Sequence, residues 1–137
     1  MITIRWTDVG NENDPLWCAA SVLYAYLSPS GREILYIGQA CGCTVRERWR
    51  RSGKAGFWNA LERDRGIRSH CVIVGVPELP AGMRLTKELL SDVESLLIAR
   101  LQPWGNIQCL GTRICRPGMV VQCRGNWPGP QRKFVDA

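Results

Sequence analysis

The sequence predicts an α/β protein of the α+β sandwich type, in which helices pack on a small mixed central sheet with an antiparallel hairpin near its N-terminal end. Three observations lead to this prediction. Two short aromatic-rich runs flank a Pro-Ser-Gly turn, which is typical of a hairpin. A continuously apolar, β-branched run at residues 70–76 indicates a buried central strand. Residues 86–101 carry leucine and valine at helical spacing. A chain of this length favours a single domain over residues 1–137.

The N-terminal part of the chain predicts one strand and the hairpin. Residues 2–6, ITIRW, favour a short strand, and residues 8–15 are a loop rich in turn formers. The hairpin strands are residues 21–27 and 33–37. A three-residue loop over 29–31 joins them, because its proline presets φ and its glycine accepts a left-handed conformation.

The register of this hairpin decides which aromatic side chains meet. With Ser28 and Arg32 flanking the loop, Tyr24 lies opposite Tyr36. Both rings then project from one face of the sheet.

Two short helices are predicted after the hairpin. Thr44 followed by Glu47 three residues later fits a capping box, so a helix runs over residues 45–51. A second helix covers residues 57–65 and ends at Gly66 in the C′ position.

The long helix over residues 86–101 is the clearest in the chain. Its leucines and valine form one apolar stripe, and Pro103 enforces its end. Glu94 falls about 90° from the centre of the stripe, so its carboxylate borders the buried face.

The C-terminal part, residues 109–137, is predicted as an extension containing a second hairpin. Residues 112–116 and 119–124 are its strands, with a Pro-Gly turn between them. The last residues, 126–137, are predicted to be irregular.

Charge and apolar content limit the classes of partner. The net charge is +6, and no apolar run approaches the ~20 residues of a membrane span. The N-terminal residues do not resemble a signal peptide, so we expect a soluble cytoplasmic protein without a membrane partner. A cluster of basic residues follows the first hairpin: Arg46, Arg48, Arg50, Arg51 and Lys54. It indicates a polyanion, with a solvated helix face as the alternative.

The seven cysteines favour reduced thiols. An odd number without a secretion signal argues against a disulfide framework. Their spacings do not form paired CxxC motifs, which leaves a structural zinc site as a weaker alternative.

Five features now stand in one order along the chain. Tyr24 ends the tripeptide Val-Leu-Tyr, and Tyr36-Ile37-Gly38 follows across the turn. The arginine-rich helix comes next, then Glu94 on the long helix, and then Asn106 after a proline. In this order the chain resembles the GIY-YIG nuclease family over about residues 20–108.

The resemblance implies a fold and an activity. It implies a GIY-YIG-like sheet and an endonuclease that hydrolyses DNA phosphodiester bonds with one Mg²⁺ (or Mn²⁺) ion. The residues that match the family's catalytic positions are Tyr24, Tyr36, Gly38, Arg48, Glu94 and Asn106.

Each implied role has a chemical reason. A single carboxylate, Glu94, suits Mg²⁺, which keeps several waters. Arg48 can present two parallel donors to a phosphate. Tyr24 would be the general base, which requires a nearby cation to lower its pKa from ~10 and predicts activation at high pH. Tyr36 would hold the water or the phosphate, and Asn106 would fix the helix end or orient Glu94.

The chain departs from the family pattern at three positions. Val22 stands where the first signature has glycine, and Gln39 stands where a lysine commonly follows the second signature. The loop before the arginine-rich helix is about two residues longer than usual, so Arg46 is a rival for the role of Arg48. Further contacts to nucleic acid are expected from Arg46, Arg50, Arg51, Lys54 and Gln39.

Two alternatives to a nuclease stay open. Val22 and Gln39 favour a nucleic-acid-binding or adaptor module that keeps the fold without turnover. The cysteines favour, more weakly, a zinc-stabilised interaction protein. If the chain is a nuclease, DNA is its substrate, and a homodimer or a targeting partner protein would supply specificity.

Overall fold

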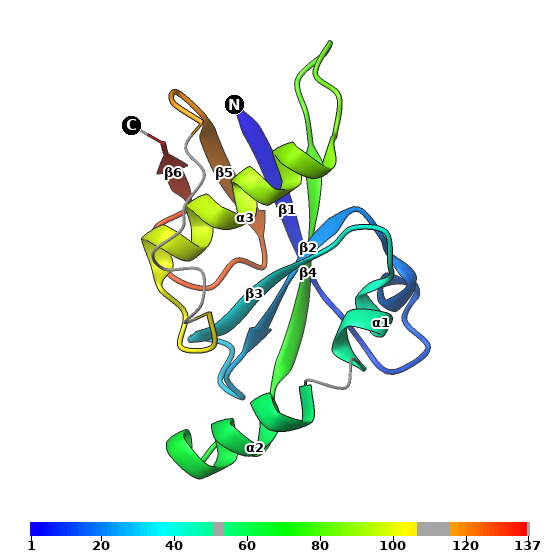
Figure 1. Cartoon of the computed structure of the whole chain (residues 1–137), viewed down its shortest axis with the longest axis vertical. Helices are drawn as coiled ribbons and strands as arrows, with labels where there is room; N and C mark the ends of the chain where they lie inside the picture. The colour runs from blue at the N-terminus through cyan, green and yellow to red at the C-terminus, as the bar shows by residue number, and fades with distance from the viewer. Residues whose placement is uncertain (51–53, 107–115, 137) are drawn as a thin grey trace.

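In the described part of the chain, the protein has a mixed α/β fold built on one curled, six-stranded sheet with three α-helices (Figure 1). The computed structural model describes residues 1–50, 54–106 and 116–136. The strand order is β3-β2-β4-β1-β5-β6. The strands are β1 (Ile2–Asp8), β2 (Val22–Leu27), β3 (Ile34–Ala40), β4 (Cys71–Glu78), β5 (Val120–Gly125) and β6 (Lys133–Val135).

The sheet is mixed because β1 pairs in parallel with β5, whereas the other neighbouring strands pair antiparallel. The apolar run at residues 70–76 lies within β4, between β2 and β1, which confirms the predicted central strand. The opening strand is also confirmed. Both β1 and the C-terminal strands lie outside residues 20–108, yet they belong to the same sheet.

Helices cover both faces of the sheet. Helix α3 (Lys87–Leu101) crosses one face in Figure 1 and buries its stripe against apolar residues of β1, β2, β4 and β5. The other face carries a smaller core. There α1 (Val45–Trp49), α2 (Lys54–Arg65) and the 3₁₀ turn η1 (Pro15–Cys18) contribute side chains around the tyrosines of β2.

The predicted hairpin is present, but its register is wrong by two residues. Tyr26, not Tyr24, lies opposite Tyr36, and Tyr24 lies opposite Gly38. Two separate one-residue departures cause this shift. The turn contains one more residue than expected, and the pairing slips again between Tyr26 and Leu27, where Leu35 is the extra residue on β3. Because side chains alternate with a period of two, the shift leaves Tyr24 and Tyr36 on one face.

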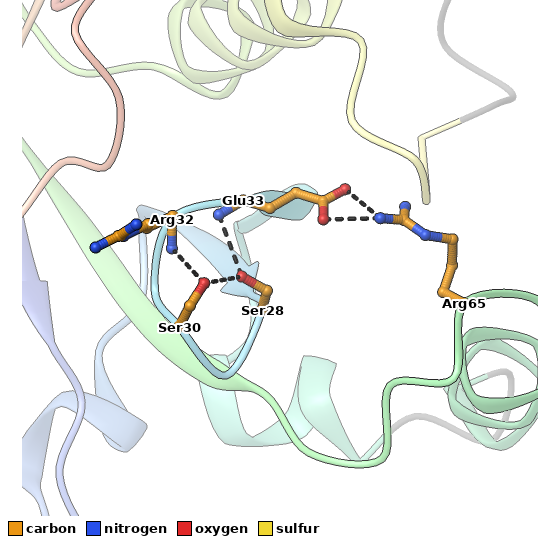
Figure 2. A network of polar contacts seen from close by, with 5 residues as sticks. All are labelled: Ser28, Ser30, Arg32, Glu33 and Arg65. Carbon is orange, nitrogen blue, oxygen red and sulfur yellow. Dashed lines mark hydrogen bonds and ion pairs between the residues drawn. The ribbon is translucent and has the colours of Figure 1, made fainter.

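The longer turn is closed by its own polar groups (Figure 2). The Ser28 amide donates to the Glu33 carbonyl at 2.9 Å, and the Glu33 amide donates to Ser28 Oγ at 3.2 Å. Gly31 has φ +75°, as the prediction required. The Glu33 carboxylate also accepts two hydrogen bonds from Arg65 Nη2, at 2.8 and 2.9 Å, which tie the turn to the end of α2.

The helices follow their capping signals. The capping box of Thr44 and Glu47 is present, and α1 ends at Trp49 with Arg50 as its C-cap. Helix α2 begins at Lys54, three residues before the predicted start, and ends before Gly66, whose φ is +65°. The predicted long helix is present as α3, with Thr86 as its N-cap.

The predicted structure of the C-terminal residues is wrong in part. Residues 119–124 include β5, but its antiparallel partner is β6, which lies within the segment predicted to be irregular. Phe134 of β6 is buried, and its neighbours in the strand are exposed, so the strand follows a short polar-apolar-polar alternation. The other predicted strand, residues 112–116, extends into residues that are outside the described part of the chain.

Within the described ranges, none of the helices has both the length and the apolar character needed to cross a bilayer.

Candidate active site at edge strand β3

Three tyrosines from β2 and β3 form a buried aromatic cluster. The ring centroids of Tyr24 and Tyr36 are 6.1 Å apart, and Tyr26 lies 5.4 Å from Tyr24 and 5.5 Å from Tyr36. Tyr24 and Tyr26 are almost fully buried, whereas Tyr36 is half-buried. The two predicted tyrosines therefore meet as diagonal neighbours, and Tyr26 joins them.

Gly38 makes room for the hydroxyl end of Tyr24. A Cβ atom at this position would lie 2.5 Å from both Cζ and Oη of Tyr24 and 2.9 Å from Cε1 of Tyr36. These distances are shorter than any stable contact between such atoms. Glycine is required here because the Tyr24 ring lies close to the β3 backbone. The absence of a side chain at Gly38 therefore allows the buried position of Tyr24.

Arg48 is close enough to both Tyr24 and Glu94 to affect their pKa values. From α1 it interacts electrostatically with Tyr24 and with Glu94, and in each case its charge lowers the partner's pKa. The Nε atom of Arg48 is buried and has no hydrogen-bond partner among the described residues. A buried guanidinium N–H without a partner is costly, and an anionic ligand could satisfy it.

The rival arginine points elsewhere. Arg46 Nη2 donates to the backbone carbonyl of Glu12, in the loop that follows β1. The geometry therefore favours Arg48 over Arg46 as the arginine of the site.

Glu94 lies on α3, across β3 from the tyrosines. Burial raises its pKa to about 7, against the opposing effects of the Arg48 charge and a hydrogen bond from Gln39. The Gln39 side chain also donates to Ser91 Oγ at 2.9 Å, and its Oε1 atom is buried without a partner in the described residues. Side chains alternate along β3, so the site straddles this edge strand, with Gln39 and Glu94 on one side and Tyr24 on the other.

The Tyr24 phenol is less acidic than that of a free tyrosine. Burial raises the pKa of Tyr24 well above its ordinary value, and the neighbouring Tyr36 and Tyr26 and a hydrogen bond with Tyr36 raise it further. Arg48 lowers the pKa but does not offset burial. The expectation that a nearby cation would bring Tyr24 toward neutral pH is therefore not met by Arg48 alone.

Asn106 has a role different from the predicted one. Its Oδ1 accepts from the Ile37 amide and its Nδ2 donates to the Ile37 carbonyl, both at 2.8 Å. The adjacent Gly105 amide donates to the Leu35 carbonyl at 2.7 Å. Both side-chain polar atoms thus bond to the outer edge of β3, so Asn106 fixes the strand that carries Tyr36 and Gly38 instead of the helix end or Glu94.

The remaining basic candidates are Arg50, Arg51 and Lys54. Arg50 is exposed at the end of α1. Arg51 lies outside the described residues, and for Lys54 only its place at the start of α2 is described.

The described residues contain no group of three or more histidine, cysteine or acidic side chains that could hold a metal ion. A structural zinc site would need such a group. The five cysteines in the described ranges are free thiols: Cys18, Cys41, Cys43, Cys71 and Cys123. Magnesium has a different requirement, since it binds through one or two oxygen ligands and retains water. The desolvated carboxylate of Glu94 fits that requirement, and the Gln39 side chain that bonds to it carries an Oε1 atom without a partner among the described residues.

Two groups beside the site were not identified from the sequence. The sequence indicates Tyr26 only as a strand residue, although its two-residue spacing from Tyr24 places it on the same face. His70 packs on the far side of Tyr26, with ring centroids 5.6 Å apart. A histidine directly before a buried strand gave no sign of this contact.

The chain matches no model of a known protein family, no curated protein and no solved structure.

Proposed function

We propose that this protein is a metal-dependent endonuclease that hydrolyses DNA phosphodiester bonds at the site around β3. The observation that carries the proposal is the position of Arg48. Its charge acts on both Tyr24 and Glu94, and its buried Nε has no partner among the described residues. This arrangement suits a phosphate placed between the phenols and the carboxylate. The net charge of +6 favours a polyanionic substrate.

Arg48 would hold the substrate. A guanidinium offers two parallel N–H donors that match two phosphate oxygens, and lysine cannot reproduce this geometry. Its charge would also offset the negative charge that develops on the phosphate during attack by water.

Tyr24 would position the attacking water. Its raised pKa keeps the phenol protonated at neutral pH, so its oxygen can accept a hydrogen bond from water while its proton is shared with Tyr36. Proton removal by Tyr24 requires the phenolate, so the rate should increase with pH above neutrality.

Glu94, with the neighbouring oxygen of Gln39, would hold Mg²⁺ or Mn²⁺. When bound, such an ion supplies positive charge to the phosphate and lowers the pKa of its bound water. A nearby cation would also stabilise the ionised carboxylate of Glu94, whose pKa burial raises to about 7.

Cleavage of a fluorescent DNA duplex in Mg²⁺ tests the proposal. We expect Arg48→Lys to reduce the cleavage rate by about 10²-fold or more, because the paired donors are lost. Tyr24→Phe should remove the alkaline increase in rate. Arg5→Lys is the matched control for exchange of an arginine for a lysine, because Arg5 is exposed on β1 and pairs with Glu78. Equal loss in Arg48→Lys and Arg5→Lys would count against the proposed site.

One observation favours a second function, a nucleic-acid-binding module without turnover. Burial keeps the Tyr24 phenol protonated, so the phenolate that could act as a base is scarce, and Gln39 supplies no charge where a lysine commonly stands in the resembled family. In that case the wild type binds DNA but does not cut it in Mg²⁺ or Mn²⁺ at any pH up to about 9, and Arg48→Lys weakens binding only.

A further inference from the structure

His70 lies in an aromatic cluster behind the tyrosines. It directly precedes β4, and its ring stacks on Trp58 with centroids 4.1 Å apart and planes inclined by 17°. The Trp49 indole Nε1 donates a hydrogen bond to His70 Nε2 at 3.1 Å. His70 is the only histidine in the chain.

This hydrogen bond is an attachment point for α1. The first turn of the helix is fixed by its capping box and by the Val45 amide, which donates to the Ala19 carbonyl at 3.0 Å. The last residue of the helix is Trp49, which contacts Trp17 with ring centroids 5.4 Å apart and bonds to His70. Arg48 directly precedes Trp49, so the contacts of Trp49 set the position from which Arg48 reaches the site.

The hydrogen bond exists only while His70 is neutral. An indole N–H is a donor alone, and a neutral imidazole has one acceptor nitrogen. Because Nε2 accepts from Trp49, the proton of neutral His70 is on Nδ1. Protonation turns Nε2 into a donor, and two donors then face each other.

The surroundings of His70 favour its neutral form. Burial lowers the pKa of the imidazole. The charged residues that line the same cavity are Glu62 of α2 and Arg68 of the segment before β4. They pair with each other at 3.1 Å, so their opposite charges largely cancel at the imidazole. Tyr26 of β2 faces His70 edge-on, and burial raises its pKa, so it carries no charge near neutrality.

We propose that neutral His70 is a positioning residue for Arg48, because it accepts the Trp49 hydrogen bond that fixes the C-terminal end of α1. Protonation of His70 breaks this hydrogen bond, so the C-terminal end of α1 is less well fixed and Arg48 binds phosphate more weakly. The inference rests on the proposed phosphate-binding role of Arg48, and it adds a residue that neither touches the substrate nor belongs to the family signatures.

The first experiment is an NMR titration of the full chain, which needs no activity. The single imidazole gives one set of ring signals, and Trp49→Phe identifies the Trp49 indole signal. We expect the imidazole and the Trp49 indole to titrate together, with one midpoint below that of a free imidazole. A Trp49 indole signal that does not follow the imidazole would overturn the proposal.

The second experiment measures the affinity for a fluorescein-labelled DNA duplex in EDTA, at constant salt, from pH 7.5 to pH 5. Adding a positive charge to a DNA-binding protein ordinarily tightens binding. The proposal predicts the opposite sign for His70, a weakening of roughly five- to tenfold in the wild type compared with His70→Gln. Glutamine keeps an acceptor near the position of Nε2 and does not titrate. Because Glu94 titrates in both proteins, the comparison removes its contribution.

His70→Phe completes the set, since it keeps an aromatic ring against Trp58 but provides no acceptor. We expect it to bind weakly at every pH in this range, like the wild type at pH 5. If His70→Gln and the wild type respond equally to pH, His70 does not position Arg48. If none of the proteins binds DNA at any pH, the proposed function fails, and the NMR titration alone decides whether His70 holds α1.

Discussion

Replacing Gly38 with alanine should disturb the site from its centre. The added Cβ would lie 2.5 Å from Cζ and Oη of Tyr24, where ordinary contacts begin near 3.4 Å, so atoms must move by close to 1 Å. Tyr24 is 2% exposed and is held by the rings of Tyr26 and Tyr36, which leaves little space for such a movement. Overpacking of this kind costs about 1–3 kcal/mol.

Urea unfolding of Gly38→Ala measures this cost, and Gly56→Ala is the matched control. Gly56 lies inside α2, and a Cβ there would meet nothing within 4 Å. Alanine in a helix interior is favoured over glycine by about 0.5–1 kcal/mol, so the control should be as stable as the wild type or more stable. The two substitutions add the same methyl group and should change the free energy of unfolding in opposite directions. Gly38→Ala with unchanged stability and unchanged DNA cleavage would refute the described packing of Tyr24.

Three further predictions concern other contacts of the fold and the site. Asn106→Leu leaves the buried amide and carbonyl of Ile37 without partners, so it should lower the free energy of unfolding in urea by at least ~2 kcal/mol. Because the pKa of Glu94 is raised from 4.5 to about 7 in the folded protein, its contribution to stability is complete below pH ~4.5 and is lost as pH rises through 7. The urea midpoint of Glu94→Gln should therefore depend less on pH between 5 and 8, and Mg²⁺ should reduce the same dependence in the wild type. Arg65→Ala should cost less than ~1 kcal/mol in the same assay, because Arg65 and Glu33 are both partly exposed.

The sequence is sufficient for a mixed α/β fold and for most elements, because their signals are local. The capping box of α1, the apolar stripe of α3 and the β-branched run of β4 each lie within a short stretch of sequence. The predicted hairpin register is wrong because neither the extra turn residue nor the bulge at Leu35 has a sequence signal. Tyr24 and Tyr36 still share one face, since two one-residue shifts restore the alternation. The strand at Phe134 was missed because three residues form it, beside a partner that is adjacent only in the folded protein.

The candidate site depends more on contacts between distant parts of the chain. Arg46 and Arg48 have similar sequence surroundings, and what separates them is the carbonyl of Glu12 in a distant loop. The raised pKa of Tyr24 depends on burial against two other phenols, which composition and spacing do not reveal. The role proposed for His70 likewise depends on its hydrogen bond with Trp49, which lies in a distant part of the sequence.

The most direct test of the central claim is the nicking of supercoiled plasmid in Mg²⁺ at pH 8, with the wild type and Glu94→Gln compared at equal concentration. Glutamine keeps the size of the side chain and removes its charge, and circular dichroism checks that the fold is retained. We predict nicking by the wild type that EDTA abolishes and that Glu94→Gln lacks. Equal nicking by a folded Glu94→Gln protein would contradict the proposed site, and no nicking by the wild type in either Mg²⁺ or Mn²⁺ would contradict the nuclease itself.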